Sequence, residues 1–304
     1  MKEAQFTERV TKLGDVLVNA EAPIAERMRT CFLLKQAAGN DLPEDAAQQA
    51  IAQLARAFDG SDSVLLKHEV AYVMGQLRNT AAIPALARVL KDTSRNCIVR
   101  HEAAEALGAI SGDEAKQLLA DFVDDDAIEV AQTARLAMRG LEFCACQTKA
   151  PSLFNSVDPA PPLPAAELSQ LRESLLDTSA SLFDRYRAMF ALRDTMQSDA
   201  ALALCDGLRD ESALFRHEIA YVLGQMMQAS AVPALLLRLR DLEEHPMVRH
   251  EAAEALGSIA IDEVRSELEL FRNDKDRVVA ESCDVALDLA EYWTSQEVST
   301  FDEA

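Results

Sequence analysis

One pattern of apolar and polar positions recurs along the chain: Val-Arg, two variable positions, and then Ala-Ala-x-Ala-Leu-Gly, clearest from Val99 to Gly108. The segment 65–88 aligns without gaps on 214–237, at an offset of 149 residues, with 12 of 24 positions identical. At the same offset, 97–110 falls on 246–259, with 11 of 14 positions identical. The chain therefore contains an internal duplication, and the pattern predicts a helix in each copy.

A shorter period lies within each half, because His68 and His101, like His217 and His250, are 33 residues apart. That spacing is typical of a solenoid of helical hairpins, and the pattern resembles the inner helix of a HEAT-like repeat. Weaker copies have their two variable positions at 28–29, 131–132, 186–187 and 280–281. We expect an all-α, HEAT-like helical-hairpin solenoid of about eight repeats, in two pseudo-twofold-related arms of four.

Prolines divide the two halves, since residues 148–166 hold five of the ten in the chain. Proline cannot continue a helix, so this segment indicates an extended linker. We therefore expect an N-terminal HEAT-repeat arm at 1–147, a Pro-rich linker at 148–166 and a C-terminal HEAT-repeat arm at 167–304. Within the arms, alanines let neighbouring inner helices approach closely, and Gly108 is expected where its helix ends.

Composition supports the helical class, because Ala and Leu dominate the hydrophobic 49% while aromatic residues make up only 5%. The net charge of −21 argues against nucleic acid, whose phosphates need a basic surface, and favours a cationic partner. The six cysteines include no C-x-x-C pair, and the start lacks the apolar core of a signal peptide. We expect a reduced, cytoplasmic protein without membrane association, with entry to the nucleus left open.

Four of the five histidines begin the same dipeptide and fill the two variable positions at the start of an inner helix; His245 is expected in a loop. The dyads are His68-Glu69, His101-Glu102, His217-Glu218 and His250-Glu251. We expect these positions on the concave surface and outside the core. If the arms close on each other, four imidazoles and four carboxylates meet, a set that suits two metal ions better than one tetrahedral zinc.

Other motifs limit the chemistry further. Glu105 and Glu254 follow His101 and His250 by four residues and could bind metal, but a solvent-facing Glu is the commoner role at that position. No dyad completes H-E-x-x-H, so a zincin protease is rejected. No G-x-S-x-G, P-loop or dinucleotide glycine pattern supports a serine hydrolase, a nucleotidase or a nicotinamide enzyme.

Two HEAT-type arms with two His-Glu dyads each resemble the deoxyhypusine hydroxylase family over nearly the whole chain. The resemblance implies a non-haem diiron enzyme with two Fe(2+) per chain and O2 as co-substrate. It also implies the reaction, the hydroxylation of the deoxyhypusine side chain to hypusine. The implied protein substrate is the deoxyhypusine-containing precursor of translation initiation factor 5A, which presents this side chain on a basic loop.

The same resemblance assigns roles to the dyads. It makes His68, His101 and Glu102 the ligands of one iron, and His217, His250 and Glu251 the ligands of the other. Glu69 and Glu218 would bind the substrate's amines, and no catalytic residue is implied beyond the metal centre. We expect the chain to be a monomer.

The residues alone leave two other functions open. One is a HEAT-like adaptor or bilin-lyase-type binding protein without redox chemistry, in which the four dyads would be idle. The other is a dinuclear metallohydrolase that holds zinc or manganese in the same ligands. Metal identity and oxygen consumption distinguish all three functions.

Overall fold

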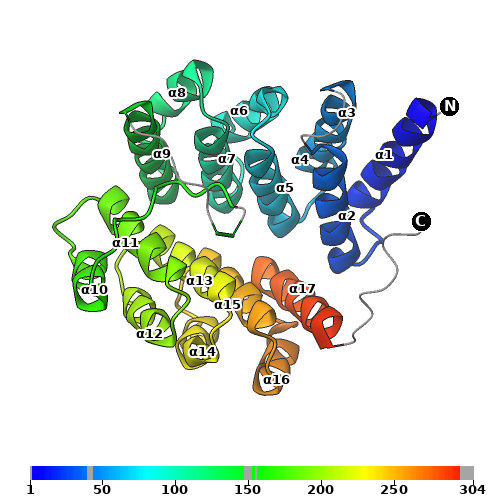
Figure 1. The fold of residues 1–304 in the computed structure, drawn as a ribbon. Helices are drawn as coiled ribbons and strands as arrows, with labels where there is room; N and C mark the ends of the chain where they lie inside the picture. The colour runs from blue at the N-terminus through cyan, green and yellow to red at the C-terminus, as the bar shows by residue number, and fades with distance from the viewer. Residues whose placement is uncertain (1, 40–43, 147–152, 155, 295–304) are drawn as a thin grey trace. The chain divides into compact units, whose positions relative to one another are not determined.

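The computed structural model describes residues 2–39, 44–146, 153–154 and 156–294, and within these ranges it contains helices and no strand. The chain divides into two compact units, Met1–Pro161 and Pro162–Ala304 (Figure 1). The predicted all-α class is confirmed. The boundary between the units falls inside the predicted linker at 148–166, of which residues 148–152 and 155 lie outside the described residues.

The first unit is a row of helical hairpins. Its inner helices α2, α5, α7 and α9 pack against one another in chain order, and outer helices precede each of them. The helices are α1 (Lys2–Val18), α2 (Ile24–Ala37), α3 (Glu44–Ala55), α4 (Ala57–Gly60), α5 (Val64–Leu77), α6 (Ile83–Lys91), α7 (Cys97–Ile110), α8 (Asp113–Ala120) and α9 (Ile128–Cys146), with a 3-10 turn η1 at Thr80–Ala82.

The second unit repeats this arrangement, with α11, α13, α15 and α17 as its inner helices. Its helices are α10 (Leu168–Leu176), α11 (Leu182–Asp194), α12 (Ser198–Gly207), α13 (Ala213–Met226), α14 (Val232–Arg240), α15 (Pro246–Ile259), α16 (Asp262–Phe271) and α17 (Arg277–Thr294), with a 3-10 turn η2 at Ala229–Ala231. The duplication in the sequence is therefore a duplication of the hairpin row.

Neighbouring inner helices touch at very short range through glycine. A Cβ added to Gly108 would lie 2.7 Å from Cβ of Ala137 on α9, and one added to Gly257 would lie 2.6 Å from Cβ of Ala286 on α17. Such distances leave no room for a side chain, so these glycines allow the close approach of the backbones. The prediction that Gly108 ends its helix is wrong, because α7 continues to Ile110.

In four of the hairpins, a buried arginine ties the hairpin to the one that follows it. Nε of Arg100 donates to the carbonyl of Leu90, ten residues earlier, and the guanidinium binds both carboxylate oxygens of Asp125, 25 residues later. Arg27 also donates to a carbonyl ten residues earlier, but its second partner is Ser61, 34 residues later. Two more ties of the Arg100 type join Arg185 to Leu175 and Asp210, and Arg249 to Leu239 and Asp274. The arginine of the repeated pattern thus links three elements in each of these hairpins.

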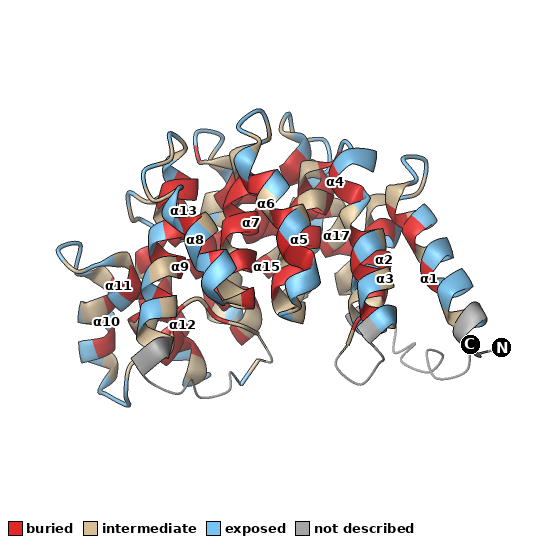
Figure 2. Cartoon of the chain, turned by 90° about the horizontal axis from the view of Figure 1, so that it is seen from above, coloured by how far each residue is buried: buried red, intermediate tan, exposed pale blue. Residues whose placement is uncertain are grey.

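Burial follows the inner helices, and Figure 2 shows α7 and α15 buried over most of their length while α1 exposes a face. The cysteines with described side chains are free thiols, and burial raises the pKa of Cys283 to about 12. Such a thiol stays protonated and unreactive at neutral pH. Among the described helices, none combines the length and the apolar character needed to cross a bilayer.

Candidate metal centres

The four dyads occupy the same place in their helices, because each helix begins at a capping side chain five residues before the histidine. In every case that side chain accepts a hydrogen bond from a backbone amide of the first turn. The caps are Ser63 for α5, Asn96 for α7, Ser212 for α13 and His245 for α15. His245, the one histidine outside the dyads, therefore fixes the start of the helix that carries His250.

In the first unit, the two dyads of neighbouring inner helices converge. The ring centres of His68 on α5 and His101 on α7 are 5.5 Å apart, with the ring planes at 41°. Nε2 of His68 lies 3.2 Å from Oε2 of Glu102, and its Nδ1 lies 3.2 Å from Oε1 of Glu69. One imidazole of α5 thus contacts the carboxylates of both dyads.

The second unit reproduces this geometry. The ring centres of His217 on α13 and His250 on α15 are 5.4 Å apart, with the planes at 44°, and Nε2 of His217 lies 3.3 Å from Oε2 of Glu251. These values differ by 0.1 Å and 3° from the corresponding ones in the first unit. Each unit therefore brings together, by itself, the two imidazoles and the carboxylate that the family resemblance assigns to one metal ion.

Donor chemistry and spacing fit a metal ion in each unit. One ligand atom each from His217, His250 and Glu251 lies within 4.8 Å of the others, and all three residues are buried. In the first unit the same holds for His101, Glu102 and Glu105, of which Glu105 is half-buried. Mixed imidazole and carboxylate ligands suit iron, zinc and manganese, so the donor set alone does not select one of these metals.

All four imidazoles are buried, with at most 5% of each residue exposed. The expectation that the dyads lie outside the core is therefore wrong, because neighbouring inner helices approach so closely that their histidines meet between them. Burial acts to lower the pKa of His68, but the carboxylates of Glu102 and Glu69 outweigh it and raise this pKa well above its ordinary value. Metal ligation requires the neutral imidazole, so a bound cation would replace that proton.

Glu254 does not face solvent freely, although the sequence pattern predicts a solvent-facing glutamate at this position. Its carboxylate is 20% exposed, lies 3.5 Å from Nδ1 of His250, and accepts a hydrogen bond from Ser282 of α17 at 2.8 Å. The sequence contains one indication that this position matters, because Glu105 and Glu254 match at the 149-residue offset. It was missed because an acidic residue one turn after a histidine can point either way until the packing of the next helix is known.

Comparison with known proteins agrees with this architecture. Residues 47–139 and 201–288 match the family described as HEAT repeats, which leaves the predicted number of about eight repeats untested. The chain is 49% identical to deoxyhypusine hydroxylase of Bos taurus over 300 residues, covering 98% of this chain and 95% of the relative. It is 45% identical to the Candida albicans protein of the same name, covering 96% and 95%.

A solved structure is similar over the same length. The structure of human deoxyhypusine hydroxylase in complex with glycerol matches with a TM-score of 0.90 and 47% identity, over 96% of this chain and 99% of that one. Sequence and structure comparisons therefore identify the same relatives.

Proposed function

Because this chain belongs to the deoxyhypusine hydroxylase family and is a hydroxylase, we propose that each unit holds one Fe(2+) for that reaction. The ligands are His68, His101 and Glu102 in the first unit, and His217, His250 and Glu251 in the second. When bound, the iron supplies the redox chemistry that activates O2, the co-substrate, toward a carbon–hydrogen bond. The observation that supports this assignment is the near-identical geometry of the two clusters.

The ligands proposed for each ion carry a single negative charge, that of the glutamate. Each cluster offers two neutral imidazoles and one carboxylate, which leaves a bound divalent ion with a net positive charge and room for other ligands. Both imidazole rings of each pair are almost fully buried. Burial excludes bulk water from the metal and so protects reactive species from side reactions.

Glu69 and Glu218 bind the amines of the substrate side chain. Both are buried, at 8% and 4% exposure, and each follows the histidine of its dyad on the same helix. A carboxylate that is not committed to a metal is available to an ammonium group, and such charge-assisted hydrogen bonds are short and directional. Such a bond fixes the position of an amine, and thereby selects the carbon that reacts.

The protein substrate is the deoxyhypusine-containing precursor of translation initiation factor 5A, presented on a basic loop. The net charge of −21 supports this partner, because a field of one sign speeds the approach of the opposite charge. We place the enzyme in the cytoplasm as a monomer. The names of the relatives favour this hydroxylase over an adaptor, a bilin lyase or a metallohydrolase.

The test combines metal analysis with turnover. Protein from iron-supplemented cells should contain about two irons per chain and convert deoxyhypusine to hypusine in the purified precursor with consumption of O2. Zinc or manganese at the same stoichiometry, without oxygen consumption, would favour a metallohydrolase. Absence of any metal after reconstitution would leave only a binding role.

A further inference from the structure

A hydroxyl from a third helix extends the metal cluster of the second unit. Ser282 of α17 is fully buried, and its Oγ donates to Oε1 of Glu254 on α15 at 2.8 Å. The same carboxylate oxygen lies 3.5 Å from Nδ1 of His250. The imidazole, the carboxylate and the hydroxyl thus form a chain that leads away from the metal ligand, and the hydroxyl restrains the carboxylate beside the imidazole.

The equivalent hydroxyl of the first unit is used differently. Thr133 of α9 matches Ser282 at the 149-residue offset and is 1% exposed. Its Oγ1 donates to the backbone carbonyl of Glu129, one turn earlier on the same helix, at 2.8 Å. A hydroxyl has a single proton to donate, so this one is not given to Glu105, the equivalent of Glu254. The side chain that fixes the carboxylate from α17 therefore has a different role on α9.

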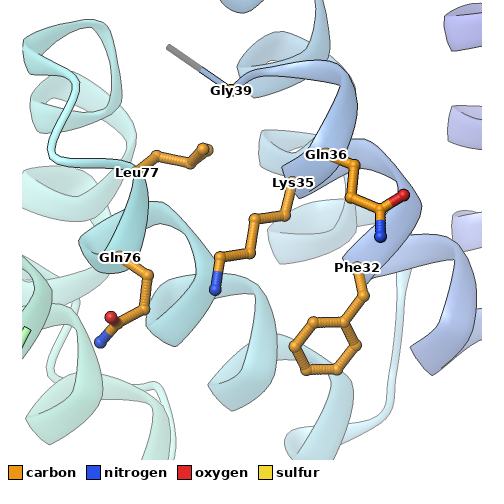
Figure 3. A pocket seen from close by; sticks show the side chains of 6 residues that line it. All are labelled: Phe32, Lys35, Gln36, Gly39, Gln76 and Leu77. Carbon is orange, nitrogen blue, oxygen red and sulfur yellow. The ribbon is translucent and has the colours of Figure 1, made fainter. Parts of the chain in front are cut away.

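Glu69 lies 3.2 Å from Nδ1 of His68 in the first unit, but its charge is not reserved for that imidazole. Burial lowers the pKa of Lys35, and the carboxylate of Glu69 opposes this shift. Figure 3 shows Lys35 extending from α2 into an open cavity of about 410 Å³, between Gln76 of α5 and Phe32. Glu69 also binds a substrate amine under the proposed function. It is therefore shared among several positive groups.

We propose that the two metal centres are unequal, and that Ser282 is a positioning residue through which the second unit binds its ion more tightly and fills first. The proposal rests on the proposed function, since it needs one ion in each unit. A carboxylate that is fixed behind a ligating histidine holds the ring ready for the metal, and such partners contribute about 10- to 100-fold in metal affinity. A chain with a single ion therefore carries it in the second unit.

The test follows the order of filling in the intact chain. The chain has five histidines, so a protein labelled with [15N]histidine gives few imidazole signals during a titration with Zn(2+). At one ion per chain, we expect the ligating nitrogens of His217 and His250 to shift. Those of His68 and His101 should shift only as the second equivalent is added. His245 caps α15 and lies outside the dyads, so its signal is the internal reference.

Ser282→Ala should weaken metal binding by the second unit about 10-fold, so that the two pairs of histidines respond together. Thr133→Ala is the matched control, because it removes an equally buried hydroxyl from the equivalent place. We expect this control to keep the order of filling and both affinities. Urea unfolding of the metal-free variants separates a loss of packing from a loss of positioning, since packing alone would lower stability without changing the order.

The order of filling in the wild-type chain tests the proposal before any variant is made. Simultaneous filling of both units, or filling of the first unit before the second, would overturn it. So would an unchanged order in Ser282→Ala, or an equal loss of affinity in Thr133→Ala. Failure of the proposed function looks different, because the imidazoles of the wild-type chain would then not respond to metal at all.

Discussion

Nδ1 of His250 lies 3.5 Å from Oε1 of Glu254, one turn later on α15. The same carboxylate oxygen accepts a hydrogen bond from Oγ of Ser282 on α17, at 2.8 Å. A carboxylate beside the far nitrogen of a ligating histidine fixes the tautomer and the ring orientation, and raises the basicity of the ligand. In the proposed metal centre, Glu254 would thus orient His250 so that Nε2 faces the metal, and the hydrogen bond from Ser282 of α17 fixes Glu254.

Glu254→Gln should weaken metal binding by the second unit about 10- to 100-fold, because the amide keeps the shape of the side chain and loses its charge. Titration with Co(2+), followed by its visible spectrum, measures the affinity without any need for turnover. Glu263→Gln is the matched control, since Glu263 is exposed on α16. Equal affinity of the Glu254 variant and the control would show that this carboxylate does not support the ligand.

His250→Ala should abolish metal binding in the second unit and leave one ion per chain. The variant removes one of the three proposed protein ligands, and a water molecule would not be held in place of the buried imidazole. Glu218→Gln should keep both ions and weaken the binding of the substrate amine. Metal analysis and binding of the precursor, measured on the same preparations, separate the two effects. Loss of metal in Glu218→Gln as well would contradict the assignment of the glutamates to different roles.

Arg185→Met should lower the free energy of unfolding by about 3–5 kcal/mol, since it leaves the buried carboxylate of Asp210 without its partner. This arginine lies in a hairpin without a dyad, so the metal content should not change. Arg265→Met is the control, because Arg265 and its partner Glu291 are 52% and 60% exposed, and such pairs contribute at most about 1 kcal/mol. Urea unfolding of both variants measures the loss in the free energy of unfolding. Equal losses would mean that the buried ion pair stabilises the fold no more than the exposed one.

The tie between Arg100 and Asp125 should also make stability depend on pH. Hydrogen bonds from Arg100 lower the pKa of Asp125 below its ordinary value of 3.8, despite the opposing effect of burial. A lowered folded-state pKa means that the stabilisation is fully present above about pH 4, and is lost as the pH falls through the depressed pKa.

The stability difference between wild type and Asp125→Asn should therefore stay constant from pH 7 to about pH 5 and shrink below about pH 4. Unfolding curves at several pH values measure it. The neighbouring Asp124 is 86% exposed, so Asp124→Asn should differ little from wild type throughout. A difference for Asp125→Asn that grows toward low pH would contradict the direction of the pKa shift.

Gly257→Ala should destabilise the second unit by about 1–3 kcal/mol, because the new methyl group would meet Ala286 at 2.6 Å. Gly224→Ala should cost less, since its nearest contact, with Ala255, would be 3.0 Å. The higher helix propensity of alanine opposes both effects by up to about 1 kcal/mol. Thermal unfolding of the two variants gives the order, and a more stable Gly257→Ala would show that the helices can separate freely.

The helices and the dyads could be predicted from the sequence because both are local patterns that occur at fixed offsets. The partners of the arginines could not, since Arg100 and Asp125 are brought together only when the intervening outer helix folds back. The burial of His101 was missed for a similar reason, because it depends on how closely the next inner helix approaches.

The match between α2 and α11 was also out of reach of sequence reasoning. Gln36 on α2 and Asp194 on α11 differ in the sequence, but the two positions become comparable only after the helices are aligned through the bonds of Arg27 and Arg185. Repeats that have diverged are therefore best compared through their shared contacts within one chain.

The spacing of the arginine ties differs in one hairpin. Arg27 and Ser61 are 34 residues apart, whereas Arg100 and Asp125 are 25 apart, so the first hairpin has gained nine residues and kept its tie. Closing the longer loop costs only about 0.3 kcal/mol in chain entropy. Most of the added length lies in the outer layer, where α3 and α4 run from Glu44 to Gly60 while the second unit has only α12, Ser198–Gly207. The outer helices can therefore lengthen at little thermodynamic expense, which makes this layer, and not the inner helices, the natural place to extend the solenoid by engineering.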